Sequence, residues 1–146
     1  MILLQTILNQ LKMKGAQLFR SITLNEGQAA SIAMIKSGFI KIPRGYLNFL
    51  NLTDGLIWKN VEFFSCGQHE RAGTVFNQPT LLEYHTKYAQ GYFFKHRLVL
   101  GYGLERLFCY NAIDRSYEWV DRDSLEVILR LPRFEDLLYQ IIFLDS

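Results

Sequence analysis

Apolar residues recur at helical spacing in the first third of the chain. Between residues 4 and 14, leucine and isoleucine return every three or four positions, which predicts an amphipathic helix. A second helix is expected to begin at Thr23, whose hydroxyl would cap it while Glu26 completes a capping box. Asn25 with Gln28 is the alternative start, and the helix should run to about residue 37.

A third helix is predicted over Pro43–Thr53. Proline suits the first helical position, because the N–H that it lacks would be unpaired there. The spacing i, i+3, i+4 gives this helix an apolar face of Tyr46, Phe49 and Leu50. A positive φ is expected where the helix stops at Asp54-Gly55, and a valine at Gly55 should then disrupt the fold.

Short apolar runs separated by turn residues predict strands further along. Leu56–Trp58 and Val61–Phe64 form one such pair, with a tight turn between them. The next stretch, Cys66–Pro79, is polar and contains glycine, which is typical of a loop. Thr80–Gln90 then predicts a fourth helix that ends before Gly91.

The second half of the chain predicts an antiparallel meander followed by a helix. Four strands are expected, at Arg97–Gly101, Leu104–Tyr110, Tyr117–Val120 and Leu125–Leu131. Gly101-Tyr102-Gly103 is interpreted as a turn between strands, and Asn111–Ser116 as a hairpin connection. Pro132 should open the last helix. This order of elements is typical of an α+β fold, and a single domain accounts for residues 1–146.

Composition narrows the classes of function. The 146 residues include 49% hydrophobic ones, ample for one core, and a formal net charge of +2. The basic residues are scattered, so the chain lacks the clustered basic face that nucleic acids or anionic membranes require. No signal peptide or spanning segment is evident, and the two cysteines suit a reducing compartment, so a cytoplasmic location is expected.

The cysteines and histidines are the only candidates for chemistry. Cys66 and His69 have a spacing that occurs in zinc sites, but the second pair of ligands that such sites need is missing. A nucleophilic dyad of Cys66 or Cys109 with a histidine such as His85 is the other possibility. A buried, inert Cys109 fits its place between aromatic residues better. We therefore assign no catalytic, metal-binding or cofactor-binding residue.

Exposed aromatic residues and charged turns are the candidates for protein binding, because tyrosine, tryptophan and arginine anchor many interfaces. Tyr84 and Tyr88 share a helix face, which packs on the sheet or serves as a contact surface. The charged residues of two hairpin turns would form a cluster beside Trp119 if the turns are neighbours, although Trp119 is alternatively a core residue. The predicted partner-binding residues are Arg71, Tyr84, Tyr88, Asp114, Arg115, Trp119, Asp121, Arg122 and Asp123.

The segment from Pro43 to Phe64 resembles the signature of the SUKH superfamily, which includes Smi/Knr-type domains and YrhA-like bacterial proteins. The matching positions are Pro43, Tyr46, Phe49-Leu50, Thr53-Asp54-Gly55-Leu56 and Phe63-Phe64. Later segments also match in order, among them Leu98–Gly101, Leu107–Asn111, Tyr117–Arg122 and Phe134–Leu138. The resemblance covers about residues 25–142.

This resemblance implies a mostly antiparallel, twisted sheet flanked by helices. It also implies a non-enzymatic protein-binding domain, most often a bacterial immunity protein that binds and neutralises a polymorphic toxin. The alternative that it implies is a regulatory or scaffold module that binds a resident cellular protein, as in cell-wall synthesis. Neither function needs a cofactor, and the oligomeric state stays open.

Overall fold

The computed structural model describes residues 3–144 of the chain and confirms the predicted α+β class. The helices are α1 (Leu4–Met13), α2 (Leu24–Lys36), α3 (Arg44–Leu50), α4 (Leu81–Tyr88), the 3₁₀ helix η1 (Tyr92–His96) and α5 (Phe134–Leu144). The strands are β1 (Gln17–Leu18), β2 (Leu56–Trp58), β3 (Val61–Phe63), β4 (His69–Glu70), β5 (Asn77–Gln78), β6 (Arg97–Gly103), β7 (Arg106–Asn111), β8 (Ser116–Asp121) and β9 (Val127–Leu131).

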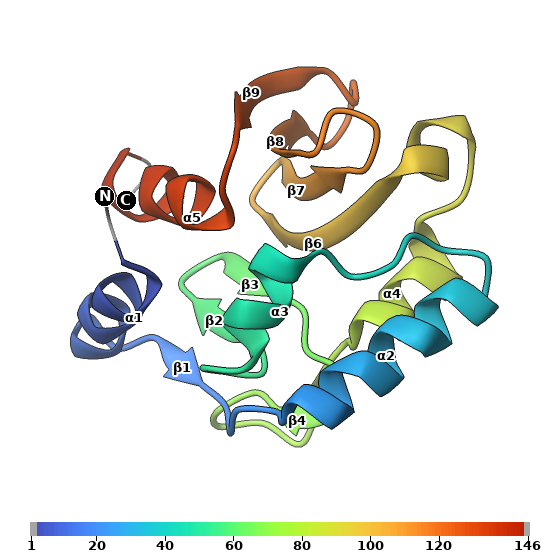
Figure 1. Cartoon of the computed structure of the whole chain (residues 1–146). Coiled ribbons are helices and arrows are strands. Elements are labelled where there is room, and N and C mark those ends of the chain that lie inside the picture. Colours follow the sequence, from blue (N-terminus) through green and yellow to red (C-terminus); the bar gives the residue numbers. More distant parts are fainter. Residues whose placement is uncertain (1–2, 145–146) are drawn as a thin grey trace.

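Seven of the strands form one antiparallel sheet in the order β1-β2-β3-β6-β7-β8-β9, while β4 and β5 form a small hairpin of their own. The chain therefore meanders from β6 to β9, as the spacing of turn residues predicts. Helix α3 lies beside β3, α1 and α5 lie at one side of the molecule, and α2 and α4 run together at the other side (Figure 1). None of the described helices is long and apolar enough to cross a membrane.

The core is densest on the sheet face that meets α3 and α5. Phe63 and Phe108 pair with Gly101 from either side, and their rings stack with centroids 5.3 Å apart. Phe134 of α5 packs edge-on against Phe63, and Phe49 of α3 packs against both of these rings. A Cβ at position 101 would lie 2.2 Å from the Glu62 carbonyl oxygen, so only glycine lets the strands approach this closely.

Several predicted boundaries are confirmed and others are wrong. Thr23 and Glu26 form the predicted capping box at α2. Helix α3 is shorter than predicted, because Pro43 has the extended ψ of a residue before a helix and the chain leaves the helix after Leu50. Gly101-Tyr102-Gly103 is not a turn but the end of β6. The actual turn follows at Leu104-Glu105, where Glu105 has a φ of 61°.

Two short pairings were not predicted. The stretch before α2, which shows no strand pattern, contains β1, and the loop Cys66–Pro79 contains the β4–β5 hairpin. Strand β1 pairs with the distant β2, and Gln17 of β1 also connects it to the hairpin, because its side chain donates to the Glu70 carbonyl and accepts from the Ala72 N–H. Two-residue strands have no periodicity of their own to read.

The backbone conformation between α3 and β2 requires glycine at position 55. Gly55 has a φ of +100°, as predicted, and a Cβ there would lie 2.9 Å from the Phe63 carbonyl oxygen. Beside it, the Thr53 hydroxyl accepts from the Phe19 N–H and donates to the Gly55 carbonyl. This three-residue junction, Thr53–Gly55, thus connects α3 to the residue that follows β1 and lies against β3.

We predict that Gly55→Val lowers the free energy of unfolding by about 4 kcal/mol or more, because backbone strain and a backbone clash act together. Gly73→Val is the matched control, since Gly73 also has a positive φ, of 77°, but open space around its Cβ position. The control should cost only about 1–2 kcal/mol from strain. Urea denaturation measures both, and equal losses would contradict the close packing at Gly55.

Candidate functional site

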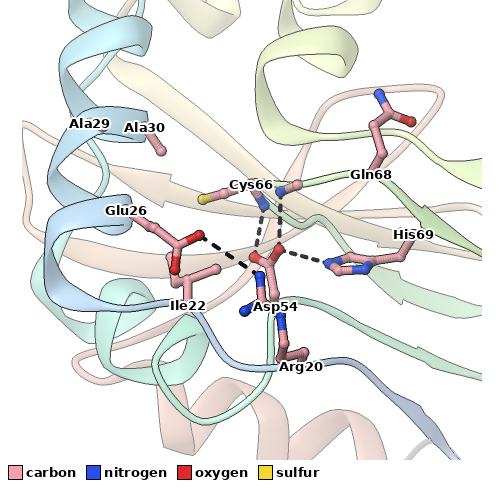
Figure 2. Close-up of a pocket in the computed structure, with 10 residues that line it drawn as sticks. Arg20, Ile22, Glu26, Ala29, Ala30, Asp54, Cys66, Gln68 and His69 are labelled. Carbon is pink, nitrogen blue, oxygen red and sulfur yellow. Dashed lines mark hydrogen bonds and ion pairs between the residues drawn. The ribbon is translucent and has the colours of Figure 1, made fainter.

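A cavity of about 480 Å³ lies beside the Thr53–Gly55 junction. Asp54 is at its floor with 1% of its surface exposed. Its carboxylate accepts from the backbone N–H groups of Cys66 and Gly67, at 2.8 and 3.0 Å, and lies 2.8 Å from Nε2 of His69 (Figure 2). A carboxylate only accepts hydrogen bonds, so the ring donates from Nε2.

The rim of this cavity is held by other contacts. The His69 ring stacks on Phe19 with centroids 4.5 Å apart. On the opposite side, Arg20 and Glu26 lie 4.0 Å apart, and Glu26 already caps the start of α2. The polar groups at the floor of the cavity are therefore engaged in holding three segments of the chain together.

The thiols are poorly suited to nucleophilic chemistry. Burial, with the nearby Asp54 carboxylate, raises the pKa of Cys66 to about 12. Its sulfur points away from the His69 ring, on the other side of Asp54 (Figure 2). Cys109 is fully buried, as predicted, and burial also raises the pKa of its thiol. Within residues 3–144, no three His, Cys, Asp or Glu side chains are grouped to hold a metal ion.

Both ring nitrogens of His85 are hydrogen-bonded to backbone groups. The Val99 N–H donates to Nε2 at 2.8 Å, so the proton is on Nδ1, which donates to the Leu81 carbonyl. Burial lowers the pKa of His85 to about 4. Beyond the end of β3, the His85 ring thus supplies the acceptor that a neighbouring strand would supply to the Val99 N–H of β6. Its role is structural.

The burial of the Asp54 carboxylate predicts that even a conservative substitution there has a large effect on stability. Asp54→Asn should lower the free energy of unfolding by about 2–4 kcal/mol, because the amide NH₂ would face N–H donors in a buried site. Asp114→Asn is the control, since Asp114 is exposed and its carboxylate has only a 3.4 Å contact with Asn111, and it should cost under about 0.5 kcal/mol. Chemical denaturation that gives equal stabilities would show that the Asp54 contacts do not hold the loop.

The lowered pKa of His85 predicts that the stability of the protein depends on pH. In the unfolded chain a histidine binds its proton below about pH 6.5, whereas folded His85 stays neutral down to about pH 4. The unfolded state therefore binds more protons in this window, and stability falls as the pH drops from about 6.5 to about 4, by about 3 kcal/mol at most.

The test compares wild type with His85→Gln, which keeps an acceptor for Val99 but has no titratable ring. The variant should be less stable at neutral pH and should lose less stability over the same acidic window. Urea midpoints measured at a series of pH values give both curves. Parallel curves would contradict the assignment.

A second candidate site is a surface on the sheet face opposite the Phe63 and Phe108 rings. Glu62 and Tyr102 are cross-strand partners, so their side chains share this face. Glu62 accepts from Arg71 and from the Tyr102 hydroxyl, both at 3.0 Å. The Arg122 guanidinium lies over the Tyr102 ring, 5.1 Å from its centroid.

Two tyrosines of α4 extend this surface. The Tyr84 ring lies 6.3 Å from that of Tyr102 and 5.2 Å from that of Tyr88. Tyr84 itself is only 6% exposed and stacks on Phe64, so it packs as a core residue and is a weak candidate for contact, whereas Tyr88 is 56% exposed. The tyrosine–arginine face is defined by these six connected residues: Glu62, Arg71, Tyr84, Tyr88, Tyr102 and Arg122.

The predicted charge cluster beside Trp119 is wrong. Strand β8 runs from Ser116 to Asp121, so Asp114 and Arg115 precede one end of it and Arg122 and Asp123 follow the other. Asp121 is further engaged by its own turn, where its carboxylate accepts from the N–H groups of Asp123 and Ser124.

Trp119 is on the core side of the sheet. It pairs across strands with Phe108, whose ring meets it edge-on at 6.1 Å, and the Arg106 guanidinium covers it at 4.5 Å. The indole is half-buried, which agrees with the alternative that Trp119 belongs to the core.

Sequence reasoning missed Glu62 and Tyr102, which connect the tyrosine–arginine face. Alternation along Val61–Phe63 places Glu62 opposite the apolar side, but its partner is 40 residues away and has no local signal. It also missed Glu118, a fully buried carboxylate held by Arg97 at 2.7 Å and Arg130 at 3.1 Å. Burial opposes ionisation of Glu118, but these hydrogen bonds outweigh it and hold its pKa below the ordinary value.

A scan of the chain against models of known protein families finds no match, and neither does a search of curated proteins.

Proposed function

We propose that this protein is a non-enzymatic protein-binding domain of the SUKH type, and that it acts in the cytoplasm as an immunity protein against a polymorphic toxin. The resemblance of residues 43–64 to the SUKH signature supports the class. The commitment of Asp54, His69 and His85 to structural hydrogen bonds supports a binding role over catalysis. The mechanism would be occlusion of the toxin domain, which needs no cofactor.

The single observation that carries the proposal is the tyrosine–arginine face. It brings together three of the predicted contact residues, from the β4–β5 hairpin, α4 and the turn after β8: Arg71, Tyr88 and Arg122. The buried Tyr84 ring connects Tyr88 to Tyr102. The side chains of the face are already positioned by mutual contacts, so less rotamer entropy is lost on binding. Tyrosine and arginine in such a setting are the residues that dominate binding energy in protein interfaces.

A tagged copy of the protein, used as bait in lysates of its own cells and of a close competitor, tests the proposal with mass spectrometry as the readout. Stoichiometric capture of one domain of a large secreted protein is the expected result. Rescue of cells that express this domain then completes the test. Capture of a resident cytoplasmic protein would instead support the regulatory module.

For a captured partner, Tyr88→Ala should weaken binding by about tenfold, because it removes the most exposed ring of the tyrosine–arginine face. Tyr92→Ala is the matched control, since Tyr92 is 90% exposed in η1 and is not among the six residues of the face. Calorimetry gives both dissociation constants. Equal effects of the two substitutions would place the contact surface elsewhere.

A further inference from the structure

We propose that a hollow at one edge of the tyrosine–arginine face accepts a carboxylate side chain of the bound protein. This inference rests on the proposed function, because it specifies the chemistry of the partner at that surface. The hollow has a volume of about 300 Å³ and lies where three hairpin turns meet. Its lining includes Lys59, Asn60, Tyr102, Leu104 and Arg122.

The three turns are fixed relative to one another. Strand β3 pairs with β6 at Glu62 and Tyr102, which holds the β2–β3 turn beside the β6–β7 turn. The Arg122 N–H donates to the Glu105 carbonyl at 3.0 Å, which ties the β8–β9 turn to the β6–β7 turn. The walls of the hollow are therefore held by backbone contacts before any partner arrives.

The charge in this hollow is positive and available. Arg122 lies over the Tyr102 ring, which orients its planar guanidinium, and none of the ion pairs among residues 3–144 involves Arg122 or Lys59. The acidic residue of the hollow, Glu62, already accepts from Arg71 and Tyr102. An oriented guanidinium with free donors is the group that best matches a carboxylate.

The surroundings favour a single carboxylate over a polyanion. Glu62 is part of the lining, and the acidic residues Glu105 and Asp123 directly follow the lining residues Leu104 and Arg122 in the chain, so the positive charge of the hollow is limited. Leu104, exposed on the lining, adds an apolar wall that suits the methylene stem of an aspartate or glutamate side chain. A protein surface that presents one acidic side chain fits these features better than a phosphate backbone does.

The test is an NMR titration of the ¹⁵N-labelled protein with hexaglutamate, and with hexaglutamine as the uncharged probe of equal length. Saturable shifts should appear only with hexaglutamate, at the amides of Lys59, Asn60, Gly103, Leu104 and Arg122. Arg122→Gln should weaken this binding by about fivefold, whereas Arg115→Gln, at the opposite end of β8, should leave it unchanged.

Both arginines are exposed, so both variants should keep the wild-type amide spectrum elsewhere. Shifts spread over all basic residues, or equal losses in the two variants, would overturn the carboxylate site. Because the probe is a peptide and not the cellular partner, this result is independent of the capture experiment. A captured partner whose affinity is unchanged by Arg122→Gln would overturn the inference and leave the proposed function standing.

Discussion

The buried carboxylate of Asp54, in the junction Thr53–Gly55, connects the end of α3 to the loop that follows β3. A carboxylate is costly to bury unless all of its oxygen atoms are hydrogen-bonded, and Asp54 meets this condition with two backbone N–H groups and one imidazole. Thr53 binds the segment before α2, and Gly55 lets β3 pass within van der Waals distance. One turn between a helix and a strand thereby fixes three segments that are distant in sequence.

The hydrogen bonds of this junction also limit what the neighbouring cavity can bind. The polar groups at the floor of the cavity beside Asp54 serve the fold, so that cavity offers few free groups to a ligand. The sheet has its aromatic core on the side of α5, and strand alternation sends Glu62 and Tyr102 to the other side. That other side carries the connected tyrosines and arginines that we propose bind a protein partner.

Local chemistry made much of the fold predictable. The capping box at Thr23, the positive φ of Gly55 and the inward face of Tyr46, Phe49 and Leu50 all follow from neighbouring residues, and all are confirmed. Strand β1 was missed and Gly101 of β6 was misread, because β1 pairs with the distant β2 and Gly101 lies against the distant Glu62. The site was predicted only in part for the same reason. Arg71 and Arg122 were named from their residue type, but nothing in the sequence shows that Glu62 meets the distant Tyr102 and thereby brings both arginines onto one face.

Hydrogen exchange of the free and partner-bound protein tests whether the tyrosine–arginine face binds the partner. Binding should add protection at residues 59–62, 71, 88, 102–104 and 122. No change is expected at the Cys66 and Gly67 amides, which Asp54 already holds in the free protein. Added protection confined to the cavity of Arg20, Glu26 and His69, with none on the tyrosine–arginine face, would show that the partner binds elsewhere.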